Sequence, residues 1–187
     1  MTKPTAQTIV EAALETLKEE GFAGASSRAI ARRGGFNQAL IFYHHGSVEG
    51  LLLAALDRTS EERLARYRAA LDGVRTLDEL VVRMGELYEE DKASGHVRVV
   101  SQMVAGSVNR PELAREVLAR MEPWVAFAEE TLARVLPPGL PVPELAYGIV
   151  TFYLGVNLLT HLDPRHERAD ALFRTARELA PLLGSFA

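Results

Sequence analysis

Residues 26–45 contain two short helical patterns separated by a pair of glycines. The first pattern spans about residues 26–33, the turn is residues 34–36, and the second spans about residues 37–45. Either glycine of the turn can adopt the positive φ that ends a helix. A helix, a short glycine turn and a second helix form the helix-turn-helix pattern, whose second helix can lie in the major groove of DNA.

Positive charge is concentrated in this part of an otherwise acidic chain. Residues 21–48 contain three arginines (Arg28, Arg32 and Arg33) and no acidic residue, whereas the whole chain has a formal net charge of −4. A basic patch on an acidic protein fits a surface that contacts phosphates. Many helical bundles also contain two helices joined by a turn, so the spacing alone leaves DNA binding and plain structural packing equally open.

A longer pattern around this segment resembles the DNA-binding domain of the TetR family of bacterial transcriptional regulators. The resemblance covers residues 9–56 and implies a three-helix DNA-binding domain followed by a larger helical domain for ligand binding and dimerisation. The matching positions are Ile9, Ala12, Ala13, Leu14, Gly21, Phe22, Ile30, Ala31, Gly35, Ile41, Phe42, Tyr43, His44, Gly46, Ser47, Glu49, Leu51 and Leu52.

Four positions depart from the pattern of this family. Phe42 stands where the family often has a phosphate-binding Tyr, and Val48 stands where it usually has a Lys that meets the DNA backbone. Two phosphate contacts are therefore absent, which predicts weaker nonspecific affinity and a shallower salt dependence. Leu40 replaces a small or hydroxylated residue, and His45 replaces a Phe. A phosphate contact by protonated His45 and a plain surface position both remain open.

The start of the second helix and the family resemblance together predict the residues that contact DNA. Asn37 or Gln38 could pair bidentately with adenine, although Asn37 could equally serve as a helix cap. The resemblance implies phosphate contacts from Tyr43 and His44. The predicted DNA-binding residues are Ser26, Arg28, Asn37, Gln38, Ala39, Leu40, Tyr43 and His44.

The composition limits the classes of protein to which the chain can belong. Its 187 residues are 48% hydrophobic, which is enough for a sizeable core, and the absence of cysteine excludes disulfides and thiolate chemistry. The first residues lack a signal-peptide core. The longest apolar run, residues 149–162, is shorter than the roughly 20 residues that span a bilayer, so we expect a buried helix there. These features predict a cytoplasmic protein without membrane contact.

Apolar residues recur at helical spacing along the rest of the chain, without the alternation typical of strands. We predict an all-α fold of about nine helices, with a helix-turn-helix domain over residues 1–46 and a helical domain over residues 47–187. One long helical pattern begins at Pro111 and continues past Pro123, which should kink or divide it.

Large apolar side chains are spread over several helices of the second half. They could line a cavity for a ligand, or they could simply fill the core. The family resemblance favours the cavity, because members commonly bind a small molecule in this half. No charged residue obviously points into such a cavity, which predicts a small apolar or aromatic effector. The predicted ligand-binding residues are Met84, Tyr88, Met103, Trp124, Phe127, Phe152 and Tyr153.

The last two predicted helices carry apolar residues at three- and four-residue spacing and two small residues, Gly148 and Gly155, that permit close helix approach. The resemblance implies a homodimer through these helices, which would set two recognition helices about 34–36 Å apart on a palindromic operator. Packing within one chain is the alternative. The apolar residues are Tyr147, Val150, Leu154, Leu158, Leu172, Ala176 and Leu179.

One cluster, His161, Asp163 and His166, contains residue types that bind metals, and it motivates an alternative as a metal hydrolase. Pro164 indicates a loop there, so a solvated turn is favoured over a metal site. The sequence has no glycine-rich phosphate loop and no nucleophile elbow. We therefore predict no enzymatic activity and no cofactor. The favoured function is a ligand-responsive repressor, and the alternative is a related interaction module that has lost DNA binding.

Overall fold

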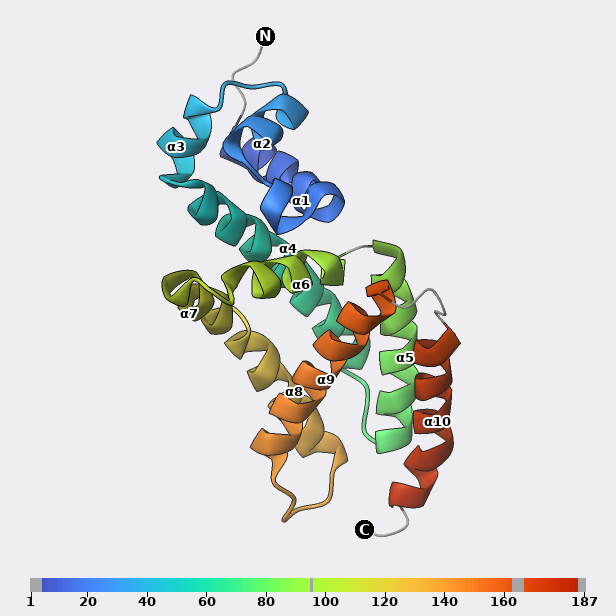
Figure 1. Cartoon of the computed structure of the whole chain (residues 1–187). Coiled ribbons are helices and arrows are strands. Elements are labelled where there is room, and N and C mark those ends of the chain that lie inside the picture. Colours follow the sequence, from blue (N-terminus) through green and yellow to red (C-terminus); the bar gives the residue numbers. More distant parts are fainter. Residues whose placement is uncertain (1–4, 95, 163–166, 185–187) are drawn as a thin grey trace. The chain divides into compact units, whose positions relative to one another are not determined.

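The computed structural model describes residues 5–94, 96–162 and 167–184, which form ten helices and no strand (Figure 1). The predicted all-α fold is confirmed. The helices are α1 (Ala6–Gly24), α2 (Ser27–Gly34), α3 (Ala39–His45), α4 (Val48–Leu71), α5 (Leu77–Ser94), α6 (His96–Ser107), α7 (Pro111–Ala119), α8 (Glu122–Val135), α9 (Val142–Leu162) and α10 (Glu167–Gly184).

The pattern that begins at Pro111 is divided into two helices, as predicted. Helix α7 ends at Ala119, and α8 begins at Glu122 with Pro123 in its first turn. A proline is tolerated there because the first amides of a helix have no partner within the helix, whereas Pro123 inside one continuous helix would remove a hydrogen bond. This division raises the number of described helices from about nine to ten.

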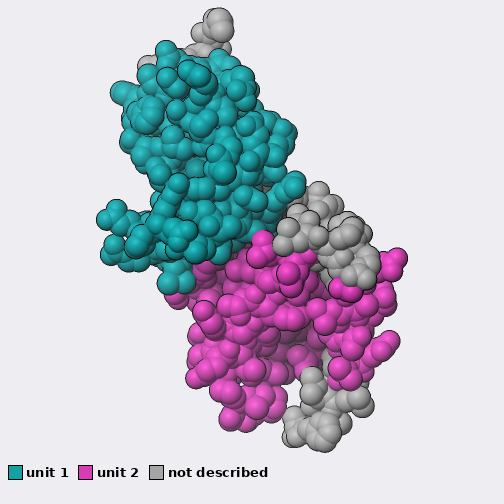
Figure 2. Space-filling view, viewed as in Figure 1, with its two compact units in different colours: residues 1–62, 95–120 teal, residues 63–94, 121–187 magenta. Residues whose placement is uncertain are grey.

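The chain divides into two compact units, which Figure 2 shows in different colours. The first unit consists of residues 1–62 and 95–120, and the second consists of residues 63–94 and 121–187. The boundary at residue 62 lies within α4. Each unit is therefore built from two separate stretches of sequence.

The first unit has a continuous apolar core formed by α1, α2, α3, the start of α4, α6 and α7. Ile9, Ala13 and Leu17 follow one another at four-residue spacing in α1 and have exposed fractions of 0%, so they form the buried stripe of this helix. Ile30 of α2 and Ile41 of α3 are equally buried against them. The two short helices are thus held in place by apolar side chains on their inner faces, which leaves the outer faces free for binding.

The end of α1 is fixed to α6 within the first unit. Gly21 has φ +70°, which breaks the helix, and the backbone N–H of Phe22 donates to Oε1 of Gln102 over 3.0 Å. A Cβ at Gly106 would lie 2.3 Å from the Phe22 ring, so only glycine allows this approach. The guanidinium carbon of Arg110 lies 4.8 Å from the centre of the same ring.

The second unit has its own apolar core, in which α8 packs against α9 and α5 packs against α10 (Figure 1). Residues from α4, α5 and α8 meet at its centre. The buried members of this core are Leu64, Tyr67, Leu71, Val74, Leu80, Leu87, Phe127, Leu132 and Ala146.

Helix α9 differs from the buried helix expected for residues 149–162. Ile149, Phe152 and Leu159 have exposed fractions of 41%, 52% and 65%. Apolar residues occur all round this helix, and the single chain covers only one side of it, so the prediction of a buried helix is wrong. By length and composition alone, residues 142–159 could cross a membrane, with a mean hydropathy of 1.3 and 11% of this stretch buried.

Candidate functional site

Local hydrogen bonds fix both ends of α2 and the turn that follows it. The hydroxyl of Ser26 accepts a hydrogen bond from the backbone N–H of Ala29 over 3.2 Å, so Ser26 is the N-cap. Gly35 has φ +66° and ψ +32°, the left-handed conformation that ends a helix with least strain in glycine. The helix-turn-helix expected from the glycine pair is therefore present.

Helix α3 begins two residues later than the sequence pattern indicates. Oδ1 of Asn37 accepts from the backbone N–H of Ala39 over 2.9 Å, and Asn37 therefore stabilises the turn before α3. Oε1 of Gln38 accepts from the hydroxyl of Ser27 over 3.4 Å. A carbonyl oxygen has two lone pairs, so both amides retain the capacity to bind a base edge.

The outer face of α3 presents three ring side chains to solvent. Phe42 and Tyr43 have exposed fractions of 49% and 77%, whereas Ile41 on the inner face has 0%. The rings of Tyr43 and His44 meet edge to face with centroids 4.9 Å apart. Because α3 is anchored by Ile41, this row of polar and aromatic groups is held on a defined surface.

Seven of the eight residues predicted to bind DNA are exposed on the first unit. Leu40 is the exception, because it is half-buried and packs against the first core. Its side chain therefore has little surface left for a thymine methyl group. The exposed seven are Ser26, Arg28, Asn37, Gln38, Ala39, Tyr43 and His44.

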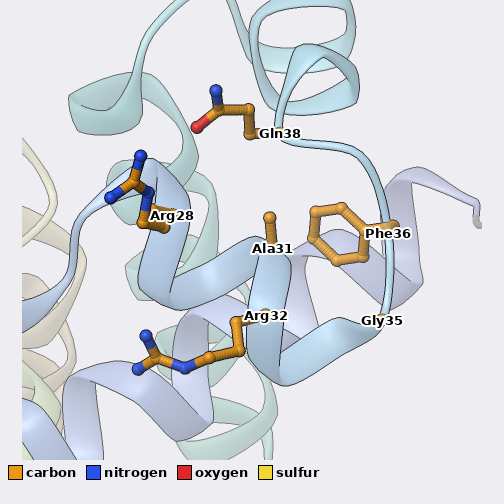
Figure 3. Close-up of a pocket in the computed structure, with 6 residues that line it drawn as sticks. All are labelled: Arg28, Ala31, Arg32, Gly35, Phe36 and Gln38. Atoms are coloured by element: carbon orange, nitrogen blue, oxygen red, sulfur yellow. The ribbon is translucent and has the colours of Figure 1, made fainter.

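An open, shallow hollow lies between α2 and the turn that leads into α3 (Figure 3). Arg28 and Arg32 project from the same side of α2, and Gln38 faces them across the hollow. Arg32 was missed as a binding residue. Its position one helical turn after Arg28 was the signal in the sequence that could have identified it.

The third arginine of this segment is paired with two acidic residues of α1. Nη2 of Arg33 lies 2.6 Å from Oε2 of Glu19 and 3.4 Å from Oε1 of Glu20. The hydrogen bond and the charge of Arg33 lower the pKa of Glu19, and the same contacts raise the pKa of Arg33. Arg32 also pairs with Glu20, over 3.7 Å, but its side chain is 68% exposed whereas that of Arg33 is 27% exposed. Arg28 and Arg32 therefore provide most of the exposed positive charge expected from the three arginines.

Two departures from the family pattern have structural consequences. Val48 is half-buried and packs against the first core, so the phosphate-binding Lys of the family is replaced by an apolar contact. Burial lowers the pKa of His45 below its ordinary value of 6.5, and the neighbouring His44 lowers it further. His45 is therefore neutral at pH 7, which disfavours a phosphate contact through a protonated ring.

The residues predicted to line a ligand cavity lie in both units. Met103 is fully buried in the first core, whereas Tyr88 and Phe127 are buried in the second unit. Phe152 is 52% exposed on α9. Met84, Trp124 and Tyr153 are half-buried residues of the second unit. The spacing of apolar residues in the sequence could not predict which of these residues are buried and which are exposed, because apolar residues of both kinds recur with the same helical period.

The second unit contains a buried polar cluster, around Arg63 and Asp91, that was not predicted from the sequence. Their side chains are 5% and 0% exposed, and Arg63 forms an ion pair with Asp91 through Oδ2. The hydroxyls of Tyr67 and Tyr153 lie 2.5 and 2.6 Å from the same oxygen. Asp91 follows Leu87 by four residues, so the helical period could have indicated its burial.

Burial raises the pKa of both tyrosines in this cluster. Tyr67 and Tyr153 therefore keep their protons at neutral pH and act as donors. Their hydroxyl oxygens lie 2.9 Å apart. Helices α4, α5 and α9 thus meet at one carboxylate, with Trp124 of α8 in edge contact with the ring of Tyr67 at a centroid distance of 5.3 Å.

Asp163 and His166 of the possible metal cluster lie outside the described residues, as does the side chain of His161. Within the described part of the chain, no group of three His, Cys, Asp or Glu residues could hold a metal ion.

Comparisons with known proteins agree with this helix-turn-helix geometry. Residues 9–55 match the model of a family described as bacterial regulatory proteins, tetR family. The chain is 30% identical over 112 residues to the HTH-type transcriptional regulator UidR of Escherichia coli strain K12, which covers 60% of this chain and 56% of the relative. The match thus spans about half the length of that relative.

Solved structures extend the similarity to the whole fold. A TetR-family transcriptional regulator from Cytophaga hutchinsonii has a TM-score of 0.79 at 15% identity, covering 96% of this chain and 97% of that one. A multidrug binding protein, EbrR, complexed with imidazole has a TM-score of 0.66 at 25% identity, covering 93% and 96%. The fold and site define an all-helical protein of the helix-turn-helix class. The chain resembles the tetR family of bacterial regulatory proteins over residues 9–55, and its fold is similar to that of a solved TetR-family structure.

Proposed function

We propose that this protein is a DNA-binding transcriptional regulator, in which the segment up to residue 46 reads the operator. The observation that supports it is the outer face of α3 and the adjacent hollow. There, Arg28, Arg32, Gln38 and Tyr43 are exposed on a scaffold whose inner face is fully buried. Arginine and tyrosine at the rim supply phosphate contacts, and the carboxamides at the start of the helix supply base contacts.

The regulator acts as a homodimer through α9 and α10 on a palindromic operator. Exposed apolar side chains on α9, including Ile149 and Phe152, and on α10, Leu172 and Leu179, support this proposal. A second copy of the chain would remove this apolar surface from water, which is the main driving force for association. Sedimentation of the full chain would measure the mass, and Phe152→Glu should shift a dimer toward monomer.

The second unit binds a small-molecule effector that releases the protein from DNA, so the regulator acts as a repressor. The half-buried aromatic residues Trp124 and Tyr153 support this proposal, as does the similarity of the fold to that of the multidrug binding protein EbrR. An effector can release DNA only if it binds the released state more tightly than the DNA-bound state. A coupling of about 1–3 kcal/mol would be typical.

Selection of bound duplexes from a random DNA pool tests the proposed function. We expect enrichment of an inverted repeat whose half-sites are about 10 base pairs apart, or a multiple of this spacing. Asn37→Ala should relax the base preference within each half-site, and Tyr43→Phe should weaken binding to all sequences alike. Arg83→Gln, at an exposed position of α5 paired with Glu86, is the matched control and should leave the enriched sequence unchanged.

The alternative function is a related interaction module that no longer binds DNA, as the loss of Tyr at Phe42 and of Lys at Val48 suggests. In that case the native chain enriches no sequence at low salt, while Val48→Lys restores binding by supplying a backbone contact. Enrichment of a DNA sequence by the native chain would instead support the regulator. In Val48→Lys, the slope of log K against log salt concentration should then be steeper by about one unit.

A further inference from the structure

The polar cluster of the second unit has one buried donor without an acceptor. Nη1 of Arg63 makes no hydrogen bond, although Arg63 is 5% exposed. A guanidinium carries five N–H donors and stays charged inside proteins. Burial lowers the pKa of Arg63, which reflects the cost of holding this charge away from water. The N–H groups of Nη1 are therefore available to an acceptor atom on a bound ligand.

Several donors around Arg63 share the same carboxylate. Its carboxylate partner, Asp91, already accepts from the hydroxyls of Tyr67 and Tyr153 at Oδ2. Oδ1 of Asp91 lies 3.5 Å from Nη2 of Arg66, which is 46% exposed and also pairs with Glu90 over 3.5 Å. One buried carboxylate thus serves two arginines and two tyrosines. A second carboxylate would supply an acceptor oxygen to Nη1 of Arg63.

Aromatic rings surround the same guanidinium. The Cζ atom of Arg63 lies 5.6 Å from the centre of the Tyr67 ring and 6.0 Å from the centre of the Trp124 ring. Trp124 and Tyr153 are half-buried, so this side of the cluster reaches the surface. Aromatic walls beside a buried cation suit a ligand with an apolar or aromatic body and an anionic head.

We propose that the second unit binds a small organic carboxylate, whose head group pairs with the free edge of Arg63 while its apolar body lies against Trp124 and Tyr67. This inference rests on the proposed function, since it names the chemical class of the effector. It also changes the prediction made from the sequence, because a purely apolar effector would leave Nη1 of Arg63 unpaired and an uncharged acceptor would form a weaker hydrogen bond with it than a carboxylate does.

Fluorescence of Trp124, the one tryptophan of the chain, provides the test. The full chain is titrated with phenylacetate, phenylpropionate and octanoate, and with the corresponding uncharged amides. We expect at least one carboxylate to change the emission with a dissociation constant at least about tenfold lower than that of its amide. Benzyltrimethylammonium tests the opposite charge and should bind more weakly than phenylacetate. Calorimetry repeats the titrations without relying on Trp124.

Variants assign the binding to Arg63. Arg63→Gln should remove the preference for carboxylate over amide. Because that change could unfold the unit by leaving Asp91 without its main cation, the double variant Arg63→Gln with Asp91→Asn keeps an uncharged pair of similar shape. It should fold, as circular dichroism would show, and it too should lose the preference. Arg83→Gln is the control and should retain it.

Two results would overturn the proposal: no carboxylate binds better than its amide, or the double variant keeps the preference. Measuring the release of DNA by each ligand distinguishes failure of the carboxylate site from failure of the proposed function. If an amide or a cation releases the selected operator and the double variant responds equally, the regulator stands and the carboxylate site is wrong. If carboxylates bind at Arg63 and the chain enriches no DNA, the carboxylate site stands and the proposed regulator is wrong.

Discussion

The two cores of this protein differ in what they bury. In the first core, Ile9, Leu17 and Ile41 are completely buried, and the hydroxyl of the buried Thr16 donates to the backbone oxygen of Ala12 over 2.7 Å. In the second unit, a buried carboxylate and a buried guanidinium lie among aromatic rings. An apolar core supports a fixed surface without depending on any single polar contact. A buried charge pair, in contrast, destabilises the fold when either partner is removed.

This difference suggests a division of roles. The first core has to present α3 in one orientation, which close apolar packing achieves. The second core contains groups whose pairing can change when a ligand enters. Four variants test this comparison, in order of decreasing expected effect.

Truncation in the first core should have the largest effect. Leu17→Ala removes a side chain that is 0% exposed and leaves a cavity, so we expect the free energy of unfolding to fall by about 2–5 kcal/mol. Urea unfolding followed by circular dichroism measures the change. Leu118→Ala, at a position 57% exposed, is the control and should change the value by less than about 0.5 kcal/mol. Equal effects at both positions would contradict the burial of Leu17.

Breaking the charge pair of the second unit should have the next largest effect. Asp91→Asn leaves the guanidinium of Arg63 buried without a carboxylate, so we expect a loss of about 3 kcal/mol in the free energy of unfolding. Adding Arg63→Gln should recover much of this loss, because the pair becomes neutral. A double variant no more stable than Asp91→Asn would show that the cost does not arise from the unpaired charge.

A substitution in the turn between α2 and α3 should lower the free energy of unfolding by a moderate amount. A Cβ at Gly35 would meet no atom within 4 Å, so Gly35→Ala tests only the positive φ of +66°. The left-handed conformation costs a residue with a Cβ roughly 1–2 kcal/mol, and we expect a loss of that size. Gly73→Ala is the control, because its Cβ would also be free of contacts and its φ is not positive.

The smallest effect should be a pH dependence from His45. Burial lowers its pKa below 6.5, so the unfolded chain takes up a proton at a higher pH than the folded chain. The stability contributed by neutral His45 is therefore complete above pH 6.5 and is lost as the pH falls through the folded pKa. The free energy of unfolding should change less between about pH 7.5 and about pH 5.5 in His45→Gln than in the native chain. An NMR titration midpoint for His45 above 6.5 would contradict this assignment.

Features determined by neighbouring residues were predictable from the sequence. The cap at Ser26, the left-handed Gly35 and the break before Pro123 depend on contacts within a few residues, and all three are found in the structure. The family resemblance extended this local pattern to the all-α fold. Arg32 followed from the same helical period but was not recognised.

Features that depend on distant residues were not predictable in this way. Arg63, Asp91 and Tyr153 come from three helices, and the residue types of Arg63 and Asp91 alone indicate solvent exposure. Only the packing of α4, α5 and α9 brings them together. Helix α9 shows the reverse error, since its apolar composition indicated burial that one chain does not supply.

The interrupted sequence of the first unit bears on how proteins of this kind can exchange parts. Val99, Met103, Leu113 and Val117 belong to the same core as α1, α2 and α3, although residues 63–94 of the second unit separate them in sequence from residues 1–62. One genetic crossover after α4 would transfer the helix-turn-helix without the four core residues that α6 and α7 contribute. Transfer of the helix-turn-helix together with its whole core into another protein therefore requires two crossovers, or compensating changes in α6 and α7.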